Sequence, residues 1–312
     1  MVQESQQTRL PILWIDGAFV TPEAAHISAL DASVQHGIGL FETMLVVCTE
    51  GGTHVHRARQ HLERMHAAAL DLRLLDQFDP GALLFVLQEA ADKAALAPGQ
   101  HARMRLTLTG GDMNLLARSG KTHHPTLILQ ITPAAIYPNE MFERGIALTV
   151  AASRANPFRP TEGYKTLDYW WRLRELQDAA SRGAGECLFL QVSNHITGGA
   201  VSNLFAVCNG ELITPIARSE EADGAIPSPV LPGITRQFII DHAQANGITM
   251  TSRMMTIADV LDADELFLTN SSWGVLPAVK VEGKTIGAGT PGPITQRLRE
   301  AWLADTRTPE NP

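Results

Sequence analysis

The sequence predicts an α+β protein with two mixed domains, and three observations support this. The chain has 312 residues, 45% of them hydrophobic, and at roughly 150 residues per domain this length suggests two domains. In both halves, short β-rich runs alternate with stretches whose apolar residues recur at helical spacing. A segment bracketed by Pro133 and Pro138 interrupts this pattern and is typical of a linker. We therefore expect domains over residues 1–133 and 141–312, joined by residues 134–140.

The first domain is expected to contain several strands and an amphipathic helix. Apolar residues recur at helical spacing between His61 and Leu75, which indicates a helix with one buried face. Apolar and polar residues alternate between Arg103 and Thr109, as in a strand with one buried face. Asp16-Gly17, after the first β-rich run, indicates a hairpin turn. The strands expected here cover residues 12–15, 41–47, 103–109 and 126–132.

The second domain contains the clearest hairpin signal of the chain. Asn209-Gly210 lies between two β-rich runs and favours a tight turn. Pro232-Gly233 precedes a helix that we expect to end near Asn246, before Gly247. Two further helices are expected over residues 167–180 and 294–303. The strands expected here cover residues 146–152, 186–192, 203–207, 211–214, 248–252, 265–269 and 275–281.

The composition excludes several classes of protein. Charged residues make up 19% and the net charge is -8, so the chain is too apolar for a disordered protein and too acidic for a general nucleic-acid binder. Its 3 Cys include no Cys-x-x-Cys pair, so we expect neither a disulfide framework nor a metal site. Residues 1–9 lack the apolar segment of a signal peptide, and no window approaches the ~18 apolar residues of a membrane helix. We expect a cytoplasmic protein that binds small molecules, with no nucleic acid or membrane partner.

Lys165 is the first candidate for chemistry. Tyr164, Leu167, Tyr169, Trp170 and Trp171 surround it in the sequence. An amine held against aromatic and apolar groups loses solvation, so its pKa falls and it becomes nucleophilic. Such a lysine can form a Schiff base with an aldehyde cofactor, although a solvated surface lysine is the alternative.

Two polar loops are candidates for binding phosphate. In Leu231-Pro-Gly-Ile-Thr-Arg236, Gly233 allows close approach of a ligand, and the next two residues offer backbone N–H groups at a helix start. An ordinary Pro-Gly turn is the alternative. Thr269-Asn-Ser-Ser272 ends a strand with hydrogen-bonding residues, which also suits either phosphate oxygens or a plain turn.

Eight segments, in this order, resemble the fold type IV pyridoxal-5′-phosphate (PLP) enzymes. That family includes branched-chain and D-amino-acid aminotransferases and aminodeoxychorismate lyases. The resemblance implies a small N-terminal α/β sandwich domain, a larger C-terminal domain with a pseudo-barrel of strands, and a homodimer with its active site at the domain boundary. The segments are Trp14–Gly17, His36–Thr43, His61–Arg64, Arg105–Gly110, Tyr164–Tyr169, Ser202–Phe205, Leu231–Arg236 and Asp264–Asn270.

The resemblance implies roles for individual residues toward the cofactor. Lys165 matches the Schiff-base lysine, which also moves the proton at the substrate carbon. Arg64 matches the arginine that pairs with the cofactor phosphate. Tyr169 resembles a tyrosine that contacts the 3′-oxygen, although its spacing from the lysine differs by one residue. The other residues implied to bind the cofactor are Gly198, Leu231, Gly233, Ile234, Thr235, Asn270 and Ser271.

The resemblance also implies residues on the substrate side. Arg105 matches an arginine that can bind a carboxylate, and Arg103, on the same strand face, competes for that role. Either arginine could instead be a solvated charge on a strand. The other residues implied to contact substrate are His36, Phe41, Thr43, Ser272 and Trp273.

Gly198 departs from the family pattern. Relatives carry a glutamate here, whose carboxylate pairs with the pyridine nitrogen of the cofactor, so this nitrogen is expected to be protonated less often. Thr197, His195 or a water could substitute, whereas Glu186 matches another acidic position and is not a replacement. An aminotransferase acting on an amino acid and a 2-oxo acid is the first hypothesis. Aminodeoxychorismate lyase, supported by Thr43 and the run that follows Asn270, is the alternative, and a protein that binds PLP without turnover is the third.

Overall fold

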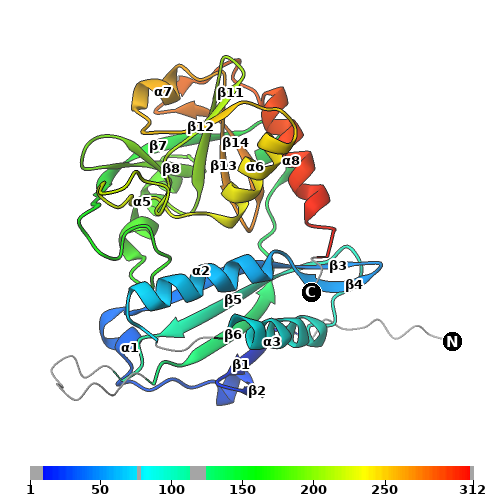
Figure 1. Ribbon diagram of the computed structural model, residues 1–312. Coiled ribbons are helices and arrows are strands. Elements are labelled where there is room, and N and C mark those ends of the chain that lie inside the picture. Colours follow the sequence, from blue (N-terminus) through cyan, green and yellow to red (C-terminus); the bar gives the residue numbers. More distant parts are fainter. Residues whose placement is uncertain (1–9, 76–78, 113–123, 310–312) are drawn as a thin grey trace. The chain divides into compact units, whose positions relative to one another are not determined.

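The computed structural model describes residues 10–75, 79–112 and 124–309 (Figure 1). Residues 1–9, on which the prediction about a signal peptide rests, lie outside this part. The chain divides into two compact units. Unit 1 comprises Met1–Ala135, Lys165–Asp168 and Thr306–Pro312, and unit 2 comprises Ile136–Tyr164 and Tyr169–Asp305. Unit 1 is therefore assembled from three separate stretches of sequence.

Unit 1 is a six-stranded antiparallel sheet with helices packed against it. The strand order is β2-β1-β6-β5-β3-β4. The strands are β1 (Ile12–Ile15), β2 (Ala18–Val20), β3 (Gly39–Thr49), β4 (Gly52–Val55), β5 (His101–Thr109) and β6 (Leu127–Pro133). The helices are the 3-10 turn η1 (Pro22–Ala24), α1 (Ala32–His36), α2 (Ala58–Asp71) and α3 (Pro80–Lys93). In Figure 1, α2 and α3 run along the sheet, and both pack against its strands.

The alternation predicted for β5 is confirmed. Met104, Leu106 and Leu108 are completely buried, as are Leu62 on α2 and Leu87 on α3. The predicted turn at Asp16-Gly17 joins β1 to β2. The sequence interpretation did not identify α3, although Asp79 accepts hydrogen bonds from two backbone N–H groups of its first turn and Pro80 occupies its first position.

Unit 2 contains a nine-stranded mixed sheet. Its order is β12-β11-β10-β13-β14-β7-β8-β9, with β15 paired to β14. The strands are β7 (Ile146–Ala155), β8 (Glu186–Gln191), β9 (Ile196–Gly199), β10 (Asn203–Cys208), β11 (Glu211–Thr214), β12 (Met250–Ser252), β13 (Glu265–Asn270), β14 (Gly274–Val281) and β15 (Lys284–Thr285). The helices are α4 (Asn139–Glu143), α5 (Trp170–Ser181), α6 (Ile234–Ala245), α7 (Ile257–Leu261) and α8 (Pro293–Asp305). The hairpin predicted at Asn209-Gly210 joins β10 to β11.

The helix predicted from residue 167 begins only at Trp170. Residues 165–168 are extended instead, because Thr166 forms an antiparallel bridge with Leu40 of β3. The backbone N–H of Phe41 donates to the Lys165 carbonyl at 2.9 Å, and the N–H of Leu167 donates to the Gly39 carbonyl at 3.0 Å. Because these backbone groups hydrogen-bond to β3, the segment is not part of the helix.

The two faces of the β10–β13 pair have different environments. Leu204, Leu268 and Leu276 belong to a large buried apolar cluster on one face. On the other face Phe205 and Phe267 stack with ring centroids 5.1 Å apart. Asn203 and Thr269 lie directly opposite each other on that same face, because side chains alternate along a strand. Helices α6 and α8 both pack against β13.

The last described residues return to unit 1. The ring nitrogen Nε2 of buried His54, in β4, lies 3.0 Å from the carbonyl oxygen of Thr306. Cys48 and Cys187 are buried, Cys208 is partly buried, and all three are free thiols. Among the described residues, no helix is long and apolar enough to cross a membrane, and no group of three or more His, Cys, Asp or Glu could hold a metal ion.

Candidate functional site

Lys165 lies half-buried against the sheet of unit 1. Its Nζ is 4.3 Å from the centroid of the Phe41 ring, and the Arg105 guanidinium carbon is 3.8 Å from the same centroid. Phe41 is only 6% exposed. Two cations therefore lie against one buried aromatic ring, an arrangement favoured by the negative face of the ring. A glycine is required at position 39 beside it, because φ there is +150° and a Cβ would lie 2.5 Å from the Leu108 carbonyl oxygen.

The aromatic residues that the sequence places around Lys165 are arranged differently from the expectation. The Phe41 ring, distant in sequence, contacts the amine. Trp170 is 66% exposed, and the Trp171 ring packs edge-to-face on Phe189 with centroids 5.0 Å apart. Trp170 thus stands at the start of α5 with most of its ring in solvent.

The residues assigned to the substrate side lie in different environments. Arg105 and Thr43 are opposite each other on β5 and β3, and both are half-buried. The Arg105 Nε donates to the Thr107 hydroxyl at 3.3 Å. Arg103 is exposed, as is His36 at the end of α1. Of the two arginines, Arg105 is the one held beside Lys165.

Arg64 belongs to a buried polar group that the sequence interpretation did not connect. Its Nε and Nη2 donate to the two carboxylate oxygens of Glu42 at 2.8 and 2.6 Å. The His61 Nδ1 lies 2.7 Å from the same carboxylate. Glu42 points from β3 toward α2, where His61 and Arg64 lie three residues apart on one face. A bidentate carboxylate therefore fixes the plane of the guanidinium.

The electrostatics of this group leave one full ion pair and a neutral imidazole. Burial alone would raise the pKa of Glu42, but the charges and hydrogen bonds of Arg64 and His61 lower it to about 2. Burial lowers the pKa of His61, and the neighbouring Glu42 only partly opposes this. His61 is therefore neutral at pH 7, and its Nδ1–H donates to the carboxylate.

Tyr169 lies at the start of α5 and contacts the turn that follows β9. Its hydroxyl donates to the Ala200 carbonyl at 3.0 Å. The Arg172 side chain, one turn further along α5, donates to the Gly199 carbonyl at 3.4 Å and to the Glu162 carboxylate at 3.3 Å. Burial raises the pKa of Glu162, and Arg172 opposes this rise. The residues on either side of the Lys165 segment are thus fixed within unit 2.

Glu186 fixes the N–H groups of the same turn. One carboxylate oxygen accepts from the Val201 N–H and the Ser202 hydroxyl, and the other accepts from the Cys187 and Ala200 N–H groups, all between 2.7 and 3.0 Å. Glu186 is completely buried, which raises its pKa. With two donors on each oxygen, this carboxylate has no acceptor site left for a pyridine nitrogen. Its geometry supports the interpretation that Glu186 does not replace the missing glutamate.

Gly198 occupies a backbone conformation that excludes other residues. Its φ is +131°, and a Cβ would lie 2.8 Å from the Ser202 carbonyl oxygen. The nearby Thr197 hydroxyl donates to the Phe189 carbonyl at 3.1 Å. His195 lies 2.9 Å from the Ser193 hydroxyl and is partly exposed. The tight turn between β9 and β10 therefore strains any side chain at this position.

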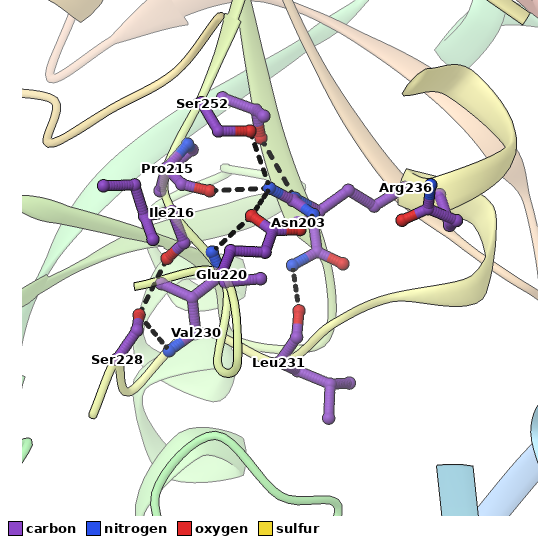
Figure 2. A network of polar contacts seen from close by, with 12 residues as sticks. Asn203, Pro215, Ile216, Glu220, Ser228, Val230, Leu231, Arg236 and Ser252 are labelled. Carbon is purple, nitrogen blue, oxygen red and sulfur yellow. Dashed lines mark hydrogen bonds and ion pairs between the residues drawn. The ribbon is translucent and has the colours of Figure 1, made fainter. Parts of the chain in front are cut away.

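The loop before α6 is held by the side chain of Asn203 (Figure 2). The Asn203 amide donates to the Leu231 carbonyl at 2.8 Å. Gly233 must lack a side chain, because a Cβ would lie 2.0 Å from the Asn203 amide oxygen. Gly233 is also the N-cap of α6, and within the described part of the chain no side chain caps this end. The N–H groups of Ile234 and Thr235 therefore begin the helix without intrahelical partners.

The second polar loop begins at the end of β13. The Asn270 amide oxygen accepts from the Ser272 and Trp273 N–H groups at 2.9 and 3.0 Å, and its amide nitrogen donates to the Val201 carbonyl at 3.3 Å. The Asn270 side chain thus fixes the backbone of this loop through its hydrogen bonds. Ser271 is half-buried next to it. Trp273 packs edge-to-face on Tyr137, with centroids 5.7 Å apart.

The residues of unit 2 fit the phosphate end of PLP. The hydroxyl oxygen of Thr269, a residue 1% exposed, has no hydrogen-bond partner among the described residues. It lies directly opposite Asn203, whose amide oxygen lies against Gly233. A buried unpaired hydroxyl beside an uncapped helix start suits an anionic group, since both would be satisfied by its oxygens. Thr269 is the first residue of the second polar loop expected from the sequence, but its pairing with Asn203 is visible only in the sheet register.

Comparisons with known proteins identify the family of the chain. The family model for "Amino-transferase class IV" matches residues 39–281. The chain is 28% identical to the branched-chain-amino-acid aminotransferase of Escherichia coli (strain K12), over 93% of this chain and 91% of that protein. A crystal structure of the T.th. branched-chain amino acid aminotransferase with pyridoxamine 5′-phosphate has a TM-score of 0.85 at 25% identity and covers 97% of both chains.

The fold is also shared with a lyase. The structure of 4-amino-4-deoxychorismate lyase from Pseudomonas aeruginosa has a TM-score of 0.76 at 24% identity and covers 95% of this chain and all of that one. This likeness concerns the fold alone, and together with the aminotransferase structures it confirms the predicted α+β architecture of fold type IV. Because the family model spans most of the chain and both sheets, the protein is an enzyme of the class IV aminotransferase family.

Proposed function

We propose that the protein is a PLP-dependent aminotransferase that moves an amino group between an amino acid and a 2-oxo acid, as its branched-chain relatives are named to do. The observation that carries the proposal is that the Lys165 amine and the Arg105 guanidinium both lie against the buried Phe41 ring. The match to branched-chain relatives over nearly their whole length supports it. PLP, when bound, supplies an electron sink for the bond that breaks at the substrate α-carbon.

In this proposal each residue has a stated task. Lys165 holds the cofactor covalently through Nζ and then moves the proton at the substrate carbon. Arg64 pairs with the phosphate, aided by the N–H groups of Ile234 and Thr235 and the Ser271 hydroxyl. Arg105 binds the substrate carboxylate as a guanidinium fork, and Phe41 keeps its plane in place. The remaining cofactor residues of the proposal are Tyr169, Gly198, Leu231, Gly233 and Asn270, and the remaining substrate residues are His36, Thr43, Arg103, Ser272 and Trp273.

The experiment is spectroscopic. Purified protein, or protein supplied with PLP, should show the visible absorbance of a lysine-bound cofactor, and Lys165→Ala should lose it. Lys93→Ala is the matched control, because Lys93 also lies over an aromatic ring of unit 1, at 4.7 Å from the Phe19 centroid, but is solvent-exposed. A wild-type protein that stays colourless with PLP would contradict the proposal.

Gly198 favours one alternative, an aminodeoxychorismate lyase. Without a carboxylate at this position the cofactor is a weaker electron sink, and formation of an aromatic product would make a weaker sink sufficient. An amino acid alone, in a single turnover, converts the cofactor of an aminotransferase to its amine form. A lyase instead releases pyruvate from aminodeoxychorismate and leaves the cofactor unchanged. A protein that binds PLP and does neither across a broad amine panel would be a binding protein.

The assembly and location are part of the same proposal. We expect a homodimer, as the family resemblance implies, and light scattering of the purified protein measures this directly. A cytoplasmic location is consistent with three free thiols and stays a prediction from the sequence.

A further inference from the structure

The loop between β11 and α6 contains an ion pair that the proposed reaction does not use. Arg236 lies in the first turn of α6, yet its side chain is 1% exposed and points back into the loop (Figure 2). Its Nη1 and Nη2 donate to the two carboxylate oxygens of Glu220 at 2.6 and 2.7 Å. A guanidinium is rarely buried so completely, and a bidentate carboxylate is the partner that makes this possible.

Arg236 also contacts the ends of two strands. Nη2 donates to the Pro215 carbonyl, just after β11, at 3.0 Å and to the Ser252 hydroxyl in β12 at 3.3 Å. Nε donates to the Thr214 hydroxyl at 3.4 Å. All of these residues, with Glu220, belong to unit 2. The first turn of α6 is therefore joined to the sheet through one side chain.

Glu220 completes the connection to the loop. Its carboxylate also accepts from the Ala217 N–H at 2.9 Å, and its own N–H donates to the Ala217 carbonyl at 3.1 Å. The Arg236 hydrogen bonds, with that of the Ala217 N–H, outweigh burial and lower the pKa of Glu220. The pair thus stays ionised at neutral pH and fixes the loop and the helix start together.

The same turn forms part of the candidate phosphate site. Gly233 and the N–H groups of Ile234 and Thr235 begin the helix without a side-chain cap in the described part of the chain. The unpaired hydroxyl of Thr269 lies nearby, opposite Asn203. Donors of this kind bind an anion well only when their positions are set before it arrives, because each bond depends steeply on geometry.

We propose that Glu220 and Arg236 are positioning residues, which set the first turn of α6 for a phosphate group without touching it. The inference rests on the proposed function, because it assumes that PLP is bound with its phosphate at this helix start. It predicts that a substitution that breaks the Glu220–Arg236 ion pair weakens binding of a phosphorylated ligand and leaves binding of its unphosphorylated counterpart unchanged.

The test compares PLP with pyridoxal, which lacks the phosphate, by equilibrium binding to the wild type and to Glu220→Gln. We expect PLP to bind about tenfold more weakly to the variant, and pyridoxal to change by less than about twofold. Hydrogen exchange at the Gln237 amide of the apoprotein, which donates to the Gly233 carbonyl at 2.8 Å, should become faster, because exchange of a hydrogen-bonded amide reports local opening. Glu282→Gln is the control, since Glu282 pairs with Arg182 at the same 2.6 Å in unit 2 but is 42% exposed.

A double variant separates positioning from stability. Glu220→Gln leaves a buried guanidinium uncompensated, whereas Glu220→Gln with Arg236→Met removes both charges and should restore the melting temperature. If the pair positions the turn, the double variant stays weak for PLP although it is stable. Equal weakening of PLP and pyridoxal, no weakening of PLP, or full recovery of PLP binding in the double variant would overturn the inference. A wild type that binds PLP no more tightly than pyridoxal contradicts the proposed phosphate site itself, and is recognised before any variant is made.

Discussion

Replacement of Glu42 by glutamine should lower the free energy of unfolding of the apoprotein by about 3 kcal/mol at pH 7. Glu42 is 1% exposed and accepts three hydrogen bonds from Arg64 and His61. Glutamine keeps the shape of the side chain but removes the charge that compensates the Arg64 guanidinium, which is itself 13% exposed. Loss of one partner from a buried ion pair is costly, because the other charge remains without compensation.

The magnitude follows from the pKa of Glu42. Its fall from 4.5 to about 2 in the fold corresponds to about 3 kcal/mol, at about 1.4 kcal/mol for each tenfold change in acidity. Since the folded pKa is the lower one, this stabilisation is complete above pH 4.5 and is lost as the pH falls toward 2. The difference between wild type and variant should therefore narrow in acid.

Urea unfolding of both proteins at pH 7 and at the lowest pH where both remain folded measures this difference. Glu63→Gln, which changes an exposed carboxylate on α2 beside Arg64, controls for the chemical change and should shift stability by less than about 0.5 kcal/mol. A Glu42→Gln difference below about 1 kcal/mol at pH 7, or one of constant size down to acidic pH, would refute the reasoning.

Three further predictions concern substrate, backbone and thiols. Arg105→Met should raise KM for amino acids about tenfold or more, with a much smaller effect of Arg103→Met, in steady-state kinetics; equal effects would remove the distinction between the two arginines. Gly198→Ala should lower the free energy of unfolding in urea by about 1–3 kcal/mol. Gly183→Ala should lower it less, because Gly183 has a φ of +76° but a Cβ there would meet none of the described residues; a cost for Gly198→Ala no larger than that of Gly183→Ala would show that the turn can adapt. Burial raises the pKa of the Cys187 thiol, and a second cysteine is also buried, so a thiol reagent should modify at most one of the three cysteines before denaturation; two or more reactive thiols would contradict the packing.

Local patterns were sufficient to predict most elements of the fold. The alternation in β5 and the Asn-Gly turn between β10 and β11 depend on neighbours in sequence, and both were predicted correctly. The start of α5 was misplaced because the preceding residues hydrogen-bond to β3, a partner far away in the chain. α3 could have been recognised from Asp79-Pro80 followed by apolar residues at helical spacing.

The candidate site was predictable only in part. The family motifs point to Lys165 and Arg64, but nothing in their own segments shows that Phe41 lies under the amine or that Glu42 pairs with the guanidinium. Adjacent residues of β3 point to opposite faces, so one reaches Lys165 and the other reaches α2. That division becomes visible only when the register of the sheet is known.

The discontinuity of unit 1 limits how the protein can be dissected. A fragment that ends at Ala135 would contain all six strands of the sheet of unit 1 but neither Lys165 nor the Thr306 carbonyl that His54 contacts. A chimera that exchanges residues 1–135 between relatives would take β3 from one parent and the Lys165–Asp168 segment, which forms a bridge to β3, from the other. Recombination within this family should therefore treat the lysine segment and the strand beneath it as one inherited block, although more than a hundred residues separate them in the sequence.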